Sequence, residues 1–324
     1  MPKPLVYITR KINKEWLSEL AKHCRVKMNS KRTPPTRTEF LAGVKAADVL
    51  VPSLVERVDE EVFRVNPKLK IVANYAVGFD NVDLVAAKKY GIPVTNTPGD
   101  YAEAVAEHAM AFLLACSRRL VEGDNYVRSG QYKFWDPLLF LGNELRHKKL
   151  GIIGTGRIGS WLAQIAKGGF GMDILYYDVA RNEDIEKKFQ AKKVSLQDLL
   201  RQSDYVSVHV PLLPSTRHLL GAKEFKMMKP TAYLINTSRG PVLDERALVV
   251  ALRNKTIAGA ALDVFEFEPK LVAGLVKLPN VVLTPHTASA TYFARRQMAE
   301  VVTANILDVL VRGQRPRNEI KDNC

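Results

Sequence analysis

Residues 150–159 read Leu150-Gly151-Ile152-Ile153-Gly154-Thr155-Gly156-Arg157-Ile158-Gly159, and this stretch decides the fold. A short apolar run leads into three glycines with the spacing G-x-G-x-x-G, which is the pattern of a strand, a tight turn and a helix. Gly154 suits the turn, Gly156 lets the backbone approach a pyrophosphate, and Gly159 lets the helix pack close to the strand. The helix that follows would point free N–H groups and the positive end of its dipole at the phosphates. The stretch therefore predicts a dinucleotide-binding turn.

An acidic residue follows the turn at the distance that such a site needs. The apolar run Ile174-Leu175-Tyr176-Tyr177 ends in Asp178. This is about 20 residues after the turn, where a carboxylate can accept hydrogen bonds from an adenosine ribose. The same carboxylate would repel a 2′-phosphate, so we predict that NAD(H) is preferred over NADP(H). The alternative is a glycine-rich turn that packs tightly and binds nothing.

Length and composition limit the class of protein. The chain has 324 residues, enough for about two domains with real cores. No apolar run reaches the roughly 18 residues that span a bilayer, and the N-terminus has no signal-peptide pattern, so we expect no membrane association. Three cysteines, Cys24, Cys116 and Cys324, lack motif spacing, which favours a reducing cytoplasm over a disulfide framework or a zinc site.

The chain is strongly basic, with 48 lysines and arginines against 34 acidic residues and a net charge of +14. Many of the charges lie early in the chain, at Arg10, Lys11, Lys14, Lys22, Arg25, Lys27, Lys31, Arg32 and Arg37. Basic faces can bind nucleic acid. However, no nucleic-acid-binding motif is present and the charges are not interleaved with aromatic residues. A solvated basic face that attracts small anionic substrates is the better interpretation.

Strand-like and helix-like segments alternate on both sides of the glycine turn, which predicts α/β folding with parallel sheets. Between the two halves, residues 103–120 read as one long core helix, and residues 123–141 follow no clear pattern. A final helix over residues 290–312 ends near the C-terminus. It is placed to return to the first half of the chain.

Three of the later predicted strands end in polar side chains. Arg239, Glu268 and His286 follow the apolar runs at residues 232–235, 258–262 and 281–283. Ligands of open α/β sheets lie beyond the carboxyl ends of the strands, so these side chains predict an active site. A guanidinium can hold a 2-oxo acid by its carboxylate, and an imidazole can give a proton to the developing alkoxide. A carboxylate on the far imidazole nitrogen would stabilise the protonated ring.

Taken singly, these residues also have simple structural interpretations. Arg239 would suit a helix end, the acids near Glu268 a solvated turn, and His286 a loop. His209 lies in a predicted strand over residues 206–210 and is interpreted as structural. The other four histidines have no partner pattern, and no spacing of ligand residues indicates a metal site.

The chain resembles the D-isomer-specific 2-hydroxyacid dehydrogenases over nearly its whole length. The resemblance is carried by Asn74 to Asp83 (NYAVGFDNVD), Gly154 to Gly159, Asn236 to Gly240, Ala261 to Phe265, Glu268-Pro269 and Thr284-Pro285-His286. It implies two Rossmann-like domains, each a doubly wound parallel sheet, with a cleft between them, and a homodimer. The implied substrate domain combines residues 1–99 and 288–324, and residues 100–287 form the dinucleotide-binding domain.

The resemblance also implies roles for single residues. The catalytic set falls on Arg239, Glu268 and His286. The substrate would meet the backbone N–H groups of Val77 and Gly78, with Leu54 in the loop that shapes the pocket. The residues implied to contact the cofactor are Thr155, Gly156, Arg157, Ile158, Asp178, Val210, Pro211, Thr237, Ser238 and Asp263.

Within the family, residues 74–81 are most similar to the glyoxylate and hydroxypyruvate reductases. The sequence His286-Thr287-Ala288 is similar to D-lactate dehydrogenases instead, so reduction of pyruvate is an alternative. The long form of phosphoglycerate dehydrogenase is less fitting, because no regulatory domain follows Arg312. Phosphite dehydrogenases are also similar, but they carry a lysine where Val77 stands, so this chain lacks their key cation. A last alternative is an NADH-responsive scaffold similar to the C-terminal-binding-protein corepressors, which keep the same three residues.

Overall fold

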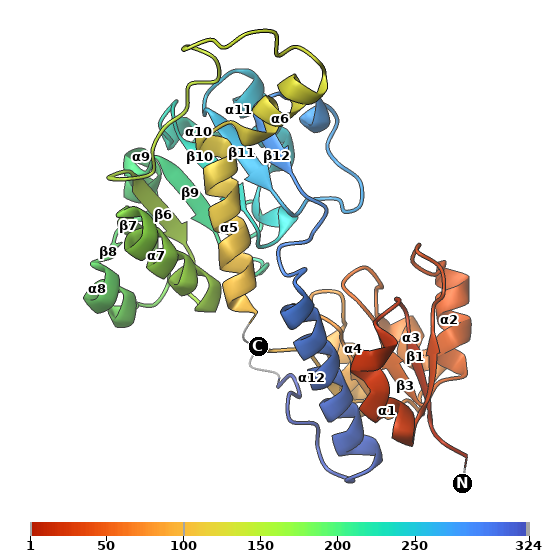
Figure 1. Cartoon of the computed structure of the whole chain (residues 1–324). Coiled ribbons are helices and arrows are strands. Elements are labelled where there is room, and N and C mark those ends of the chain that lie inside the picture. Colours follow the sequence, from red (N-terminus) through yellow and green to blue (C-terminus); the bar gives the residue numbers. More distant parts are fainter. Residues whose placement is uncertain (1, 100, 322–324) are drawn as a thin grey trace. The chain divides into compact units, whose positions relative to one another are not determined.

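The computed structural model describes residues 2–99 and 101–321. Its internal contacts divide the chain into two units, which we name the terminal unit (residues 1–100 and 291–324) and the central unit (residues 101–290). The sequence placed the two boundaries after residues 99 and 287, within three residues of these divisions. Both chain ends thus contribute to the terminal unit (Figure 1).

The central unit is a seven-stranded parallel sheet in the order β12-β11-β10-β9-β6-β7-β8. Its strands are β6 (Lys149–Ile153), β7 (Asp173–Tyr177), β8 (Lys192–Lys193), β9 (Tyr205–Val208), β10 (Tyr233–Asn236), β11 (Gly259–Leu262) and β12 (Val281–Leu283). The strand order reverses next to β6, which pairs with β7 on one side and with β9 on the other. Ligands of doubly wound sheets bind at this reversal, outside the carboxyl ends of the strands.

Helices cover both faces of this sheet. One face carries α5 (Ala102–Ser117), α7 (Arg157–Phe170) and α8 (Glu183–Phe189). The other carries α9 (Leu196–Gln202), α10 (Ala222–Met227) and α11 (Glu245–Arg253). The strands between them are buried on both sides, which explains their continuous apolar runs. The unit also contains two short 3₁₀ turns, η2 (Gly240–Val242) and η3 (Leu275–Lys277).

The terminal unit is a five-stranded parallel sheet in the order β2-β1-β3-β4-β5, a second doubly wound arrangement. Its strands are β1 (Leu5–Ile8), β2 (Arg25–Met28), β3 (Val49–Val51), β4 (Ile71–Ala73) and β5 (Val94–Thr95). Helices α2 (Arg37–Lys45), α3 (Glu60–Val65) and α4 (Leu84–Lys89) pack on one face. The other face is covered by η1 (Lys14–Leu17), α1 (Ser18–His23) and α12 (Tyr292–Leu310).

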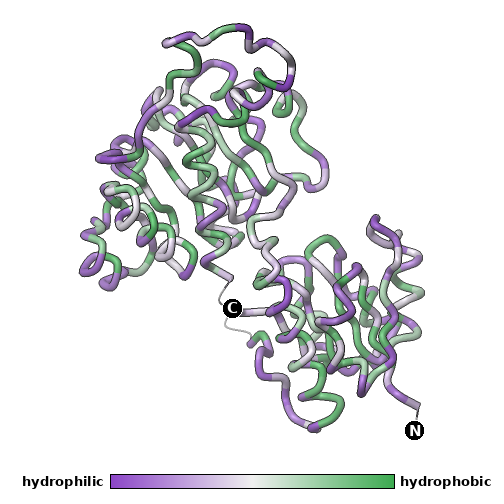
Figure 2. Tube along the Cα trace, in the orientation of Figure 1, coloured by the Kyte–Doolittle hydropathy of each residue, from purple (hydrophilic) through white to green (hydrophobic). Residues whose placement is uncertain are grey.

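The long C-terminal helix α12 belongs to the terminal unit, as its predicted return to the first half required. Ala299, Val302 and Ile306 are buried against β1, β3 and β4. Figure 2 shows hydrophobic residues along the strands, with hydrophilic residues most frequent on the surrounding helices and loops. Among the described residues, no helix is both long and apolar enough to cross a membrane.

The segment between the two sheets differs from its prediction. The helix expected over residues 103–120 is α5, which ends at Ser117. A second helix that the sequence did not predict, α6 (Leu120–Arg128), follows Arg119, which adopts a left-handed φ of 52°. Residues 129–148 then form a long loop that contains no helix or strand (Figure 1). The strand predicted over residues 206–210 is also shorter and ends at Val208. Apolar periodicity marks burial, but it does not mark the residue at which the backbone turns away.

Candidate active site

The glycine turn has the conformation that its sequence predicts. Gly154 has φ 93°, and a Cβ on it would lie 2.9 Å from the backbone carbon of His209. A Cβ on Gly159 would collide with the carbonyl oxygen of Gly154, so α7 can pack this close to the turn only with glycine there. At Gly156, which caps α7, a Cβ would meet nothing within 4 Å. The turn is thus closely packed at Gly154 and Gly159 and open at Gly156, which fits a pyrophosphate bound at the N-terminus of α7.

Asp178 closes the turn from the end of β7. One of its carboxylate oxygens accepts hydrogen bonds from Thr155 N at 2.6 Å and Thr155 Oγ1 at 3.1 Å. Its other oxygen accepts a longer bond from Ala180 N at 3.4 Å. A cavity of about 530 Å³ opens beside these residues, lined also by Gly156 and by residues 181–184 of the following loop and α8. An adenosine would fit here with its ribose against Asp178.

Other residues of the predicted cofactor site lie along the same edge of the sheet. Val210 and Pro211 follow β9, and the Val210 side chain lies against the glycine turn. Thr237 follows β10, and its hydroxyl is buried without a hydrogen-bond partner among the described residues. A buried hydroxyl without a partner is costly, so this atom fits a site that is completed by a ligand. By these features the residues fit a dinucleotide.

His286 and Glu268 form a hydrogen-bonded pair. His286 Nδ1 lies 2.9 Å from Glu268 Oε2, and the other Glu268 oxygen accepts from Phe265 N at 2.9 Å. Burial raises the pKa of the Glu268 carboxyl, but the hydrogen bond and charge of His286 outweigh it, and the pKa lies below its usual value. The carboxylate is therefore ionised near neutral pH, and it leaves His286 Nε2 as the nitrogen that can face a substrate.

Arg239 lies beside this pair. It follows β10, and its positive charge contributes to the lowered pKa of Glu268. The next residue, Gly240, packs so tightly on the backbone of Phe265 that any side chain there would collide with it. The end of β10 and the loop that carries Glu268 are thereby held together. Asn236, fully buried, fixes the turn further by donating to the Arg239 carbonyl at 3.0 Å and accepting from Ser238 N and Oγ.

A buried carboxylate holds the loop of His286. Asp263 is fully buried and accepts hydrogen bonds from Thr284 Oγ1 at 2.5 Å and from the N–H groups of Thr287 and Ala288, each at 2.7 Å. His286 itself has φ 55°, a left-handed conformation that costs a non-glycine residue about 1–2 kcal/mol. The Asp263 bonds on both sides stabilise this conformation. Contact of Asp263 with the cofactor, which the resemblance implies, stays a prediction.

Two glutamates, Glu245 and Glu266, hold the loop of Glu268 by hydrogen bonds to each other's backbone. Glu245 N donates to Glu266 Oε2 at 3.2 Å, and Glu266 N donates to Glu245 Oε2 at 3.0 Å. Burial, followed by the nearby charges of Glu266 and Glu268, raises the pKa of Glu245 above its usual value. His218 pairs with Glu266 at 2.7 Å. No sequence pattern predicts this partner of His218, because 48 residues separate it from Glu266.

Two further histidines gain partners in the fold. His108 on α5 lies 3.1 Å from the hydroxyl of Thr284, so it borders the Asp263 network. Burial lowers the pKa of His108, against the opposing charge of Asp263. His209 contacts Ser207 Oγ at 2.9 Å, and burial of its ring lowers its pKa to about 3. His209 is therefore neutral, in agreement with a structural role.

The predicted substrate residues of the terminal unit lie at the carboxyl ends of β3 and β4. The N–H groups of Val77 and Gly78 have no partner within the part of the chain that the structure describes. Their carbonyls, in contrast, accept from Asn96 at 2.7 Å and from Asn74 at 2.9 Å. The turn is thus held by its oxygens while its N–H groups are left to bind an anion.

A network of buried polar groups joins this turn to the loop of Leu54. Glu56 Oε2 accepts from Thr9 Oγ1 at 2.6 Å and from Ser53 N and Oγ, each at 2.8 Å. Asn81 Nδ2 donates to the carbonyls of Ser53 and Glu56 at 2.9 and 3.2 Å, and exchanges hydrogen bonds with Asn74. The sequence analysis missed Glu56. Asn74 and Asn81 were only part of a matched motif, since their role depends on contacts across the sheet end.

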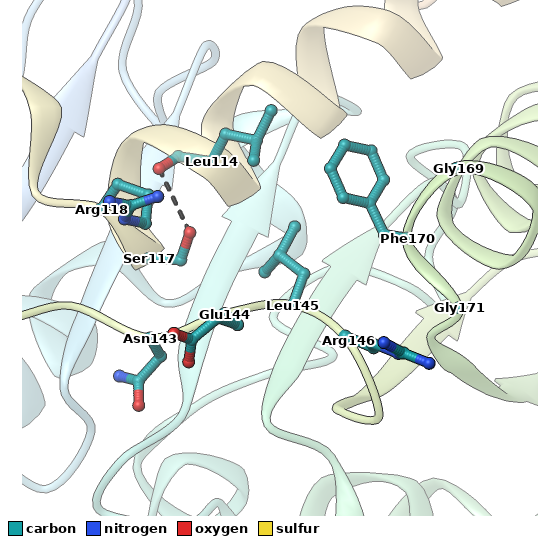
Figure 3. Close-up of a pocket in the computed structure, with 10 residues that line it drawn as sticks. All are labelled: Leu114, Ser117, Arg118, Asn143, Glu144, Leu145, Arg146, Gly169, Phe170 and Gly171. Carbon is teal, nitrogen blue, oxygen red and sulfur yellow. Dashed lines mark hydrogen bonds between the residues drawn. The ribbon is translucent and has the colours of Figure 1, made fainter.

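A second cavity lies at the amino ends of the strands of the central sheet, where the chain enters β6. It has a volume of about 420 Å³, and Figure 3 shows Leu145 between Leu114 and Phe170 on its inner side, with Arg118 and Arg146 beside them. None of the predicted site residues lines it. The predicted site residues that line a cavity, among them Thr155, Gly156 and Asp178, lie instead at the carboxyl ends of the strands.

Comparisons with known proteins agree with this geometry. The family model for the D-isomer specific 2-hydroxyacid dehydrogenase NAD binding domain matches residues 110–288. Glyoxylate reductase of Korarchaeum cryptofilum is 48% identical over 318 residues, which are 98% of this chain and 95% of the relative. The crystal structure of the TT0316 protein from Thermus thermophilus is 40% identical, with a TM-score of 0.90 and coverage of 98% and 100%. An acyclic imino acid reductase in complex with NADPH and D-Arg is 29% identical, with a TM-score of 0.84 and coverage of 98% and 100%.

Proposed function

The chain belongs to the D-isomer-specific 2-hydroxyacid dehydrogenases and is an NAD-dependent oxidoreductase; from this premise we propose that it reduces glyoxylate or hydroxypyruvate with NADH. The observation that supports the chemistry is the His286–Glu268 pair next to Arg239. The curated relatives named glyoxylate reductases support the substrate class.

We propose that Arg239 holds the substrate carboxylate and polarises the neighbouring carbonyl, since a planar guanidinium offers two parallel donors. The nicotinamide supplies the hydride when it is bound. His286 donates a proton from Nε2 to the oxygen that becomes a hydroxyl, and takes it back in the reverse direction. Glu268 is a positioning residue that orients the ring and stabilises its protonated form.

The proposed contacts of the substrate in the terminal unit are the N–H groups of Val77 and Gly78, with Leu54 shaping the pocket. The cofactor is proposed to contact Thr155, Gly156, Arg157, Ile158, Asp178, Val210, Pro211, Thr237, Ser238 and Asp263. The open space over Gly156 and the unpartnered hydroxyl of Thr237 support this assignment.

A substrate panel tests the proposal. The purified protein is mixed with NADH and with glyoxylate, hydroxypyruvate or pyruvate, and oxidation is followed by absorbance of the nicotinamide. We expect the highest kcat/KM with glyoxylate or hydroxypyruvate. The highest value with pyruvate would indicate a D-lactate dehydrogenase. Tight binding of NADH without turnover of any oxo acid would indicate a scaffold similar to the C-terminal-binding-protein corepressors.

We propose that NADH is preferred over NADPH, because the carboxylate of Asp178 lies at the ribose end of the cavity and would repel a 2′-phosphate. A relative with NADPH bound shows that the fold itself allows either cofactor. The same panel repeated with NADPH tests the preference. A lower KM for NADPH than for NADH would contradict it.

We propose a homodimer in which a second copy covers residues 120–141. Exposed apolar side chains gather there; they are Leu120, Val121, Val127, Tyr132, Phe134, Trp135, Leu138 and Leu141. Arg119 and Tyr126 pack against the Phe140 ring, so part of the segment is held in place. A concentration of large exposed apolar side chains in one segment favours an interface.

Mass measurement by light scattering tests the dimer. We expect the double variant Trp135→Ser/Leu138→Ser to shift toward monomer, while Val85→Ser, an equally exposed apolar change on α4, leaves the mass unchanged. A wild-type monomer at all concentrations would contradict the proposal.

We also infer a reducing, cytoplasmic location. Cys24 and Cys116 are buried free thiols, and burial raises the pKa of Cys116 to about 12, so neither is poised to form a disulfide. Fractionation of the source cells tests this inference, and recovery of the protein outside the cytoplasm would contradict it.

A further inference from the structure

The cavity beside the glycine turn contains charges of both signs. Asp178, Glu183 and Asp184 line it, and so do Arg181 and Lys187. Two cations at the ribose end of such a cavity are unexpected in a site that should exclude a 2′-phosphate. Whether these cations can bind a phosphate depends on the ion pairs that they already form.

Arg181 forms an ion pair with the carboxylate of Glu186. Its Nε donates to Glu186 Oε2 at 2.9 Å, and a terminal nitrogen lies 2.7 Å from the same oxygen. The hydrogen bond and charge of Glu186 raise the pKa of Arg181, and Arg181 lowers the pKa of Glu186, so both groups are charged. Arg181 is exposed, whereas the Glu186 side chain is only 17% exposed.

Glu186 is held from the inside of the protein. Its other oxygen accepts a hydrogen bond from the hydroxyl of Tyr176 at 2.7 Å, and the Tyr176 side chain on β7 is fully buried. The same hydroxyl accepts from Asn182 N at 3.0 Å, and Asn182 Nδ2 donates to the Thr155 carbonyl at 2.8 Å. A continuous chain of hydrogen bonds therefore joins Glu186 to the glycine turn.

We propose that Glu186 is a specificity-determining residue for the nucleotide, because it binds the Arg181 guanidinium and keeps it from a 2′-phosphate. The proposal rests on the proposed function, in which this cavity takes the adenosine of the cofactor. An arginine with free donors would hold a phosphate by two parallel bonds. In the ion pair, the positive charge of Arg181 is offset by the negative charge of Glu186, so the carboxylate of Asp178 is left to repel a 2′-phosphate.

The variant Glu186→Gln tests the proposal. Glutamine keeps an oxygen that can accept from Tyr176, but it removes the negative charge that holds Arg181. We expect the Kd of NADPH to fall about tenfold, the size of one charge-assisted hydrogen bond, with the Kd of NADH within about twofold of wild type. Both constants are measured by fluorescence titration without substrate, so the readout does not depend on turnover.

Two further variants make the test specific. Glu183→Gln is the matched control, because it removes the same charge from the same helix without touching the partner of Arg181. Glu183 lines the cavity and pairs with Lys187 at 2.8 Å. We expect it to change the Kd of NADPH less than threefold. The double variant Arg181→Gln/Glu186→Gln should lose the gain entirely.

Three results would overturn the proposal: no gain in Glu186→Gln, an equal gain in Glu183→Gln, or a gain that survives in the double variant. A wild-type protein that binds neither NADH nor NADPH would instead reject the proposed function, and this proposal with it.

Discussion

The two units place different groups at the carboxyl ends of their strands. In the central unit these groups are side chains, namely Arg239, Glu268 and His286. In the terminal unit they are the backbone N–H groups of Val77 and Gly78. Both units hold their loops by the same means, a buried polar side chain that satisfies the loop backbone: Asp263 in one unit and Asn74 in the other.

This difference separates reaction from binding. A side chain can transfer a proton or stabilise a charge that develops during the reaction, so its loss lowers kcat. The backbone donors proposed to hold the substrate carboxylate would do so equally before and during the reaction, so their displacement should raise KM. Variants of His286 and Glu268 should therefore act mainly on kcat and variants of the terminal unit mainly on KM. Variants of Arg239, which is proposed both to bind the substrate and to polarise its carbonyl, should act on both.

The largest effect is expected for His286→Ala. Loss of the proton donor should lower kcat by about 10²- to 10⁴-fold, with the Kd of NADH unchanged. Steady-state kinetics and fluorescence titration measure the two quantities. His23→Ala, which changes an exposed histidine of the terminal unit, is the control. Turnover within tenfold of wild type would remove His286 from its proposed role.

Arg239→Ala should reduce kcat/KM by about a hundredfold, with a large rise in KM as well as a fall in kcat, because the residue binds the substrate and polarises its carbonyl. Arg239→Lys keeps the charge but loses the planar fork, and we expect only partial recovery. Full recovery by lysine would show that charge alone suffices. A variant with normal KM would place the carboxylate elsewhere.

Glu268→Gln should change the pH profile. The carboxyl is ionised at neutral pH because its pKa lies below its usual value, and its charge favours the protonated ring of His286. Without that charge the protonated ring is less stabilised, so reduction should fade at a lower pH than in wild type. Oxidation needs the neutral ring and should begin at lower pH as well. Profiles in both directions that match wild type would contradict the assignment.

The smallest effect is expected in the terminal unit, for Glu56→Gln. The carboxylate holds the loop of Leu54 through Ser53, and its neutral replacement weakens these bonds. We expect KM for the oxo acid to rise about fivefold with kcat nearly unchanged. Glu60→Gln, which breaks an exposed ion pair with Lys89 on neighbouring helices, is the matched control. A fall in kcat without a change in KM would break the contrast between the units.

Local pattern was enough to predict the glycine turn, the alternation of elements and the residues that follow the strands. It failed between α5 and α6, where both flanking segments are helical but Arg119 is left-handed. Apolar periodicity gave no sign of α6, because none of the residues of this helix is buried. It also gave no sign of the His218–Glu266 pair or of the Glu56 network, whose members are distant in the chain or separated by a turn.

The sequence by itself determined the dinucleotide turn, since glycines at fixed spacing and an acid after the next strand leave few other conformations. It also identified Arg239, Glu268 and His286 as candidates, because strand ends can be located from apolar runs. Only the tertiary structure decided how these groups are held: the left-handed His286 between the hydrogen bonds of Asp263, and Arg181 bound by a glutamate that a buried tyrosine holds. The physical reason is that hydrogen bonds between distant segments depend on sheet order and loop path, which residue spacing does not encode.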